Sequence, residues 1–168
     1  MAVNELEVLA TQLGEVLLAK GWRLVTAESC TGGWVAQAVT AIAGSSNWFD
    51  RGFVSYSNEA KQDMLGVQPA ALAEHGAVSE VVVREMVEGA LAHSRADLAL
   101  AISGIAGPTG GSTEKPVGTV WLAWAVRDGV RTARVFHFQG DRAEVRRQSV
   151  MVALRGALQL LEAEVGRA

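Results

Sequence analysis

Ser29 is the side chain of this sequence best suited by its position to act as a nucleophile. It follows the β-prone run 23–27 and precedes the glycine pair at 32–33 and a segment that favours a helix. A serine at a strand-to-helix turn can project its hydroxyl into a cleft, beside free backbone N–H groups of the helix's first turn that would form an oxyanion hole. The same position has a structural alternative, because Ser29 and Thr31 are also suitable helix N-caps.

Lys61 is the candidate base for that serine, whose hydroxyl is a weak nucleophile until a base takes its proton. The histidines lie outside the segments that carry the other candidates, at His75, His93 and His137. Lys61 must be neutral to accept a proton, which requires burial or a nearby cation that lowers its pKa. Tyr56 could relay or orient that proton. The alternative for Lys61 is a solvated charge in the first turns of a helix.

Cys30 is the only cysteine, which excludes a disulfide within one chain. It is either a small buried apolar residue or a rival nucleophile, and the sequence places no histidine beside it. No set of His, Cys, Asp and Glu residues has the spacing of metal ligands, so we expect neither a metal nor another cofactor.

A second candidate region is the loop 104–116, which contains four glycines, two prolines and two threonines. Gly104 and Gly107 could let the backbone approach a phosphate or a sugar closely. The loop lacks the Gly-Lys-Ser/Thr ending of a Walker A motif, and no Gly-x-Gly-x-x-Gly opens a helix after a strand. Arg142, near the start of the last predicted helix, could bind an anion together with helix N–H groups, or it could be a surface arginine.

The hydrophobic pattern predicts the elements that must position these residues. Helices are expected over 5–20, 34–43, 61–65 after a cap at Ser57 or Asn58, 80–94, and from a capping box of Asp141 and Glu144 onward. Strands are expected over 23–27, 52–56, 98–103, 117–126 and 131–138, with a hairpin at Asp128-Gly129 and a connector at 69–76. This order predicts an α/β fold, a three-layer α/β/α domain with a mixed β-sheet. The segments 28–33, 56–61 and 103–118 would then meet beyond the carboxyl ends of strands, where such folds bind ligands.

Composition narrows the class of protein. Of 168 residues, 15 are Lys or Arg and 18 are Asp or Glu, a formal net charge of −3, and 49% are apolar. We expect a single domain over 1–168, because a chain of this length buries about 70% of its unfolded surface. The acidic balance argues against general nucleic-acid binding. The N-terminus lacks the positive start of a secretory signal, and polar residues interrupt the uncharged stretch 29–49, so we expect a cytoplasmic protein without a membrane segment.

A series of motifs in fixed order resembles the C-terminal domain family of the competence/damage-inducible protein CinA. They are Thr-Ala-Glu-Ser-Cys-Thr-Gly-Gly at 26–33, Gly-Ser-Ser at 44–46, Gly-Phe-Val-Ser-Tyr-Ser-Asn-Glu-Ala-Lys at 52–61, His-Gly-Ala-Val-Ser-Glu at 75–80, Ser-Gly-Ile-Ala-Gly-Pro at 103–108, Lys-Pro-Val-Gly-Thr-Val at 115–120 and Gly-Asp-Arg at 140–142. The resemblance covers nearly the whole chain and is far more specific than any one glycine loop.

The resemblance implies hydrolysis of the carboxamide of nicotinamide mononucleotide to nicotinic acid mononucleotide and ammonia. It implies Ser29 as nucleophile, Lys61 as base and Tyr56 as its assistant, with Ser46 as a further candidate for proton transfer or oxyanion support. The implied substrate-binding residues are Cys30, Thr31, Gly32, Gly33, Gly104, Gly107 and Arg142, the last three of which would hold the ribose phosphate. Thr109 stands where the family often has aspartate and receives no role.

Two rival hypotheses remain beside this one. The same loops and Arg142 could serve a non-catalytic module that senses a pyridine nucleotide, or Cys30 could be the nucleophile of a cysteine amidase. The expected partner is the small-molecule substrate, without nucleic acid or membrane. An antiparallel edge and an apolar hairpin also lead us to expect a homo-oligomer.

Overall fold

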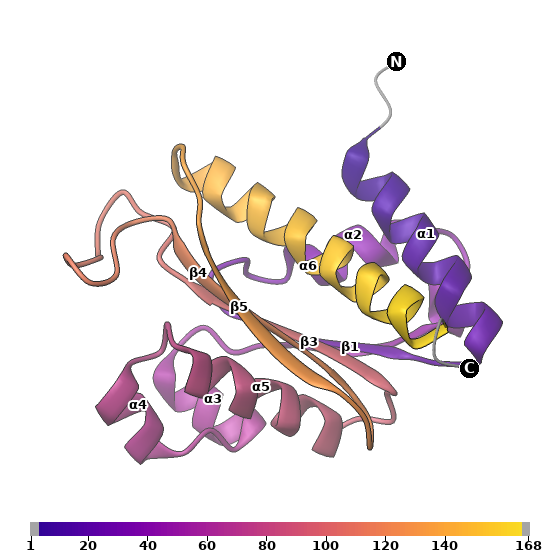
Figure 1. The fold of residues 1–168 in the computed structure, drawn as a ribbon, viewed down its shortest axis with the longest axis horizontal. Helices are drawn as coiled ribbons and strands as arrows, with labels where there is room; N and C mark the ends of the chain where they lie inside the picture. The colour runs from indigo at the N-terminus through magenta and orange to yellow at the C-terminus, as the bar shows by residue number, and fades with distance from the viewer. Residues whose placement is uncertain (1–3, 166–168) are drawn as a thin grey trace.

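One mixed sheet of five strands forms the centre of the computed structural model, which describes residues 4–165 (Figure 1). The strands run in the order β2-β1-β3-β4-β5. Their bounds are Leu24–Glu28 for β1, Phe49–Val54 for β2, Leu98–Gly104 for β3, Thr119–Val126 for β4 and Arg131–His137 for β5. β1 pairs in parallel with β2 and β3, whereas β4 is antiparallel to β3 and β5. The predicted α/β fold with a mixed sheet is confirmed.

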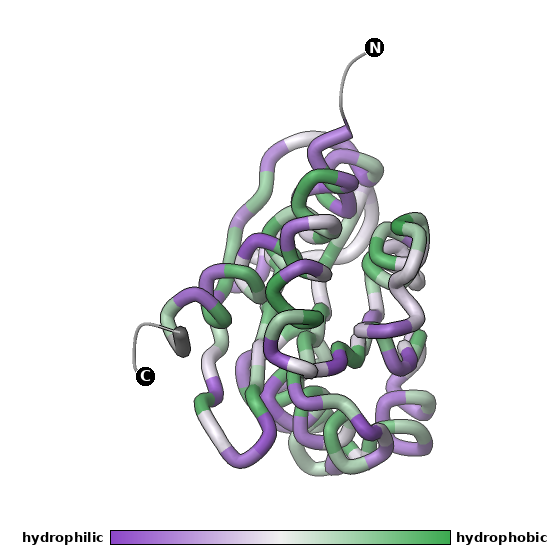
Figure 2. Tube along the Cα trace, turned by 90° about the vertical axis from the view of Figure 1, so that its right-hand side faces the viewer, coloured by the Kyte–Doolittle hydropathy of each residue, from purple (hydrophilic) through white to green (hydrophobic). Residues whose placement is uncertain are grey.

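Helices cover both faces of this sheet, as Figure 1 shows. On one face lie α1 (Glu5–Lys20), α2 (Trp34–Thr40) and α6 (Arg142–Val165), and on the other lie α3 (Asn58–Leu65), α4 (Pro69–His75) and α5 (Glu80–Ala92). Figure 2 shows hydrophobic and hydrophilic residues alternating along the coils of the helices, as expected for helices with one buried face. Among residues 4–165, no helix combines the length and the apolar character needed to cross a membrane.

β3 separates two apolar cores. Leu98, Leu100 and Ile102 point into the core beneath α1, α2 and α6, while Ala99 and Ala101 point into the core beneath α3, α4 and α5. All five side chains are buried. The nearly all-apolar run at 98–103 therefore belongs to a strand that is covered on both faces, as its sequence predicts.

Helix caps explain where several elements begin and end. The Asn4 side chain accepts the Leu6 N–H at 3.0 Å, and Ser57 accepts the Ala60 N–H at 3.0 Å at the start of α3. α1 stops at Gly21, whose φ of 68° lies in the left-handed region that favours glycine. The predicted start of α3 at Ser57 or Asn58 thus resolves to Ser57 as the cap.

Some boundaries differ from the sequence prediction. The connector expected at 69–76 contains helix α4, because Pro69 occupies its first turn, where a missing N–H is harmless, and Leu72 on the inner side of the helix is buried. α2 ends at Thr40, and β2 begins at Phe49, where it pairs with β1. The capping box at α6 is half formed: Asp141 accepts the Glu144 N–H at 2.9 Å, but the Glu144 carboxylate binds Arg147.

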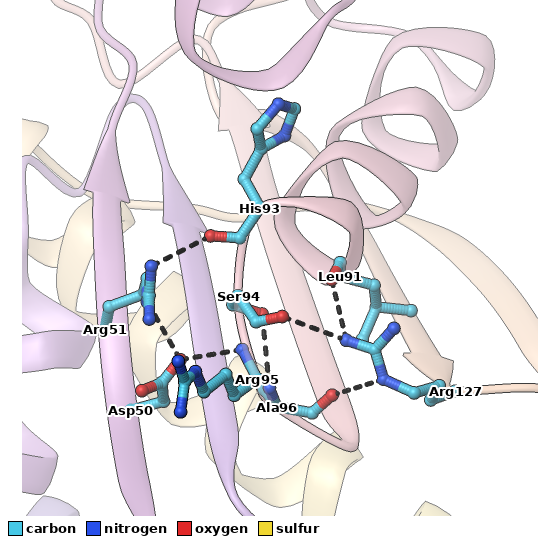
Figure 3. Close-up of polar contacts among 8 residues, drawn as sticks. All are labelled: Asp50, Arg51, Leu91, His93, Ser94, Arg95, Ala96 and Arg127. Carbon is cyan, nitrogen blue, oxygen red and sulfur yellow. Dashed lines mark hydrogen bonds and ion pairs between the residues drawn. The ribbon is translucent and has the colours of Figure 1, made fainter.

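Arginine side chains fasten the amino edge of the sheet, the edge at which β1, β2 and β3 begin (Figure 3). Arg127 donates from Nε to the Ala96 carbonyl at 2.8 Å and from Nη2 to the Leu91 carbonyl at 2.7 Å. Arg51 donates from Nη1 to the His93 carbonyl at 3.1 Å and from Nε to the Asp50 carboxylate at 2.8 Å. These guanidinium groups satisfy main-chain carbonyls where α5 turns into β3.

Candidate active site

Three strand ends meet at the carboxyl edge of the sheet, the edge at which the parallel strands β1, β2 and β3 end. In the register, Glu28 of β1 lies beside Val54 of β2 and Ile102 of β3. The ladder continues past the strands, since the Ser29 N–H donates to the Ile102 carbonyl at 3.1 Å and the Ser55 N–H to the Glu28 carbonyl at 2.8 Å. Residues that are far apart in sequence therefore share one edge.

A cavity of about 300 Å³ opens at this edge. Its lining comes from the turn after β1, the turn after β2 and start of α3, the segment after α4, the loop after β3 and the start of α6. The lining residues are Ser29, Cys30, Tyr56, Asn58, Lys61, Ala77, Val78, Ser103, Gly104, Ile105, Ala106, Gly107, Thr109, Gly110, Gly111 and Arg142.

Ser29 and Lys61 are in direct contact in this cavity. The Lys61 Nζ lies 3.0 Å from the Ser29 Oγ, and both side chains are buried, with exposed fractions of 1% and 8%. The sequence segments that carry them follow different strands, so the parallel pairing of β1 with β2 brings the two groups together. The predicted nucleophile and base therefore lie within hydrogen-bonding distance.

The other partners of Lys61 fix what its amine can do. The Ser55 carbonyl lies 2.9 Å and the Tyr56 carbonyl 3.3 Å from Nζ, and a carbonyl can only accept. A neutral amine has two N–H groups and one lone pair. When the two carbonyls take the N–H groups, the lone pair is left for the hydroxyl proton of Ser29. This is the arrangement that a serine and its general base require.

Burial shifts the proton affinity of both titratable groups beside Ser29. It lowers the pKa of Lys61 from 10.5, and the nearby Cys30 opposes that shift. Burial also raises the pKa of the Cys30 thiol to about 11. At ordinary pH the neutral form of the Lys61 amine becomes more populated and the thiolate form of Cys30 less populated. This favours serine over cysteine as the nucleophile.

A buried carboxylate holds the turn that carries Ser29. Glu28 accepts the Thr31 hydroxyl at 2.7 Å and the backbone N–H groups of Val35 at 2.8 Å and Ala36 at 3.0 Å. The N–H groups of the first turn of α2 are therefore occupied, and the sequence-based expectation that they form an oxyanion hole is wrong. The Cys30 N–H, which directly follows the serine, donates to no acceptor on another residue within the range 4–165.

Arg142 and Tyr56 meet across the mouth of the cavity. Arg142 donates from Nη1 to the Gly107 carbonyl at 2.8 Å and from Nη2 to the Tyr56 hydroxyl at 3.2 Å. The Tyr56 side chain is 61% exposed, and this residue contacts Lys61 through its carbonyl. Tyr56 therefore orients the lysine amine by its main chain, while its phenol faces the arginine.

The charge of the cavity is positive. Arg142 carries a permanent positive charge, Lys61 carries one only when protonated, and no Asp or Glu stands among the described residues that line the cavity. Over residues 4–165, no group of three or more His, Cys, Asp or Glu side chains is arranged to hold a metal ion. The polar groups that this part of the chain presents at the carboxyl edge therefore include a hydroxyl, an amine, a guanidinium and backbone groups.

Seven of the eleven site residues predicted from sequence line the cavity: Ser29, Cys30, Tyr56, Lys61, Gly104, Gly107 and Arg142. Thr31 is fully buried beneath the turn, and Gly32 and Gly33 shape that turn with φ values of 60° and 99°. Ser46 is exposed on the short 3₁₀ helix η1 (Ser45–Asn47), which leads into the start of β2 and so lies at the amino edge. The structure does not bring Ser46 to the cavity of the same chain.

Sequence reasoning missed other lining residues. Ser103, with 1% of its surface exposed, ends the buried run of β3 beside the Ser29 turn, and its position after an apolar strand was an available signal. Ala77 and Val78 carry no reactive group that a pattern could reveal. They reach the cavity because the segment after α4 is tied to the loop after β3, where the Lys115 Nζ donates to the His75 carbonyl at 2.6 Å.

Comparison with known proteins adds the family. The model of the CinA C-terminal domain matches residues 6–161. The chain belongs to the CinA C-terminal domain family. Among the relatives of this CinA domain, nicotinamide-nucleotide amidohydrolase PncC of Escherichia coli (strain K12) is 59% identical over 155 residues, which are 92% of this chain and 94% of that protein. The protein of the same name from Pseudomonas putida is 52% identical over 162 residues, 94% of this chain and 98% of that protein.

Solved structures of CinA proteins share the fold. The crystal structure of the competence/damage inducible protein CihA from Agrobacterium tumefaciens superposes with a TM-score of 0.92 at 45% identity, and the match covers 96% of this chain and 99% of that one. The expectation of CinA family membership is therefore confirmed at the levels of sequence and of fold.

Proposed function

We propose that this CinA domain is a nicotinamide-nucleotide amidohydrolase, which converts nicotinamide mononucleotide and water to nicotinic acid mononucleotide and ammonia. The relatives named for that activity match over 92–94% of the chain. The observation that carries the proposal is the 3.0 Å contact between the buried Lys61 amine and the Ser29 hydroxyl. A serine with an adjacent neutral amine is a nucleophile with its base, which acyl transfer requires.

The first half of the reaction acylates Ser29. The Ser29 oxygen attacks the carboxamide carbon while its proton passes to the Lys61 amine. The tetrahedral intermediate then collapses, Lys61 returns the proton to the amide nitrogen, the C–N bond breaks and ammonia leaves. A nicotinoyl ester on Ser29 remains. Lys61 serves as base and then as acid, with the two carbonyls of residues 55 and 56 as its fixed partners.

The second half restores the enzyme by the same relay. Water loses a proton to Lys61 and attacks the ester carbon. The second intermediate collapses with transfer of that proton to the Ser29 oxygen, which releases the nucleotide carboxylic acid. No oxidant, reductant or further group is consumed, so the balance is one amide and one water to one acid and one ammonia.

The Cys30 N–H is our proposed oxyanion donor. In serine hydrolases with a strand-to-helix nucleophile turn, the N–H of the residue after the nucleophile fills this role. Here that N–H has no acceptor on another described residue, and Cys30 lines the cavity. One such donor contributes about 3–4 kcal/mol to stabilising the transition state. Thr31, Gly32 and Gly33 support this turn from below.

The positive cavity suits the phosphate of a mononucleotide. Two of the five guanidinium N–H groups of Arg142 are used by Gly107 and Tyr56, which leaves others for a phosphate oxygen. The glycine-rich segment through Gly104 and Gly107 lines the same side of the cavity. We assign phosphate binding to these three residues and acyl transfer to Ser29 and Lys61.

Three broader expectations belong to the proposal as well. A single domain over 1–168 agrees with the one sheet and two helix layers of residues 4–165. A homo-oligomer would cover exposed apolar side chains such as Val54 on β2 and Val135 on β5, the two outer strands of the sheet. We place the reaction in the cytoplasm.

Ser46 stays a predicted contributor to proton transfer or oxyanion support, and a turnover unchanged in Ser46→Ala would remove it from the proposal.

The test is hydrolysis of nicotinamide mononucleotide by purified, chelator-treated protein, followed through ammonia and the nucleotide product together. We expect equal amounts of both, and for Ser29→Ala a loss of about 10⁴-fold or more in turnover. Ser94→Ala is a matched control, since it removes a serine hydroxyl that accepts the Ala96 N–H at the amino edge, outside the cavity lining. Binding without ammonia release by the wild type would support the sensor hypothesis, and an active Ser29→Ala would discard serine as the nucleophile.

A further inference from the structure

One guanidinium from α6 holds the main chain of the nucleophile turn. Arg146 donates from Nε to the Cys30 carbonyl at 3.0 Å and from Nη2 to the Thr31 carbonyl at 3.3 Å. Its guanidinium lies over the Trp34 ring, 5.5 Å from the centroid. A fork of two donors, stacked on a ring, fixes two successive peptide groups more tightly than a single donor could.

Those two peptide groups lead back to the proposed oxyanion donor. In a trans peptide the carbonyl and the N–H point in opposite directions, so holding the Thr31 carbonyl orients the Gly32 N–H. That N–H donates to the Ser29 carbonyl at 3.0 Å. The Ser29 carbonyl and the Cys30 N–H belong to the same peptide group, so the hydrogen bond from Gly32 orients the Cys30 N–H. Arg146 holds the Cys30 carbonyl and so fixes the peptide group on the other side of Cys30.

Gly32 lies against the guanidinium of Arg146. Its φ of 60° is in the left-handed region, and a Cβ built there would stand 3.6 Å from the Arg146 Nη2. The guanidinium therefore lies within ordinary van der Waals distance of the turn at Gly32, one of its two glycines.

We propose that Arg146 is a positioning residue for the reaction, which aims the Cys30 N–H at the developing oxyanion by holding the carbonyls of Cys30 and Thr31. This inference rests on the proposed function, because it assigns the oxyanion donor of that reaction. Arg146 touches neither the cavity nor the reacting atoms and acts through the main chain of the turn.

The neighbouring arginines on α6 define what is particular to Arg146. Arg142 stands one turn earlier on the same helix face and reaches the cavity. Arg147 is the next residue along, also half-buried, but its guanidinium binds Glu144 and Met151 within α6. Arg147→Met is therefore a matched control, since it removes a guanidinium of the same helix that has no contact with the turn.

The experiment compares Arg146→Met, Arg146→Lys and Arg147→Met with the wild type in kcat, KM and affinity for nicotinic acid mononucleotide. We expect kcat of Arg146→Met to fall about 10²-fold, with KM and product affinity changed by less than about threefold. Arg146→Lys keeps the charge but lacks the fork, so it should lose most of the same rate. Arg147→Met should keep the wild-type rate.

A second measurement keeps the inference independent of the substrate. A fluorophosphonate reagent reacts with an activated serine: the Ser29 oxygen bonds to phosphorus, fluoride leaves, the proton goes to Lys61, and the phosphoryl oxygen occupies the oxyanion position. We expect labelling of Arg146→Met to be slowed in the same proportion as kcat, and labelling of Arg147→Met to match the wild type.

The outcomes separate the two proposals. A wild type that is labelled at Ser29 but releases no ammonia from nicotinamide mononucleotide would overturn the proposed substrate, while slower labelling of Arg146→Met would still support the positioning role. Labelling and kcat of Arg146→Met within about twofold of wild type would overturn the role of Arg146. Equal losses of rate, product affinity and thermal stability would overturn it too, since they indicate a structural contact only.

Discussion

At both edges of the sheet a cationic side chain donates to main-chain carbonyls, but the contact serves a different purpose at each. At the amino edge, Arg127 and Arg51 donate to main-chain carbonyls at the junction of α5 and β3. At the carboxyl edge, the Lys61 amine also donates to two main-chain carbonyls. The difference is that the Lys61 amine also contacts a hydroxyl, that of Ser29, and is almost fully buried, whereas the Arg51 side chain is 45% exposed.

That difference shows what turns a structural cation into a base. A guanidinium keeps its proton at any ordinary pH, so the arginines can only donate and fasten the chain. A buried lysine amine can lose its proton, because burial disfavours the charged form. The carboxyl edge therefore needs both the lysine and its burial, and the amino edge needs neither.

The largest expected effect comes from replacing the lysine of the carboxyl edge by an arginine, the cation found at the amino edge. We expect Lys61→Arg to lower turnover of nicotinamide mononucleotide by about 10³–10⁴-fold, because a guanidinium cannot accept the serine proton. Steady-state ammonia release measures this loss.

Lys61→Met, of similar length but neutral, controls for disruption of the buried site, with thermal unfolding confirming that each variant folds. A Lys61→Arg protein with more than about a tenth of the wild-type rate would show that the base is another group.

The pH dependence of kcat/KM sharpens the comparison. Burial lowers the pKa of Lys61 from 10.5, and the base must be neutral to act. Activity should therefore rise with pH, about tenfold per unit below the lowered pKa, and level off above it. A profile from pH 5 to 10 locates this limb.

The same shift fixes the sign of the stability effect. Lys61 binds its proton less tightly in the folded state, so folding should become more favourable as pH rises from the lowered pKa towards 10.5. An activity limb that does not bend below 10.5 would contradict a lysine base whose pKa is lowered.

The smallest expected effect on turnover lies at the amino edge. Arg127→Ala removes the donors to the Ala96 and Leu91 carbonyls, and we expect a loss of about 1–3 kcal/mol in the free energy of unfolding, with kcat unchanged. Urea unfolding measures the first quantity and ammonia release the second. A fall in kcat at full folding would mean that the two edges are coupled through β3, and the comparison would fail.

The sequence carried most of the fold because its local signals agree with its packing. The uncharged apolar run at 98–103, the caps at Asn4 and Ser57, and the Asp128-Gly129 hairpin each predicted an element that is present. The helix at 69–75 was not predicted, because a proline is as common in a turn as in the first turn of a helix. This helix depends on the burial of Leu72 in the core beneath α3, α4 and α5.

The site was predictable as far as residue types and strand ends reach. Ser29 and Lys61 follow strands whose parallel pairing could be expected, and they meet. The oxyanion hole was misassigned, because nothing in the spacing reveals that the Glu28 carboxylate folds onto the start of α2 and occupies its N–H groups. The same limit hid Arg146, whose contact with the turn spans more than a hundred residues of sequence.

The partners of the Lys61 amine have a consequence for how this site can change over evolution. Its anchoring acceptors are the carbonyls of residues 55 and 56, which every amino acid supplies, and their positions are set by the end of β2 and the start of α3. The position of the base is therefore set by main-chain atoms and does not depend on the side chain at position 56. Substitutions of Tyr56 and Asn58 can reshape the mouth of the cavity while the proton-transfer pair stays where it is, so the domain can diversify its ligands without rebuilding its chemistry.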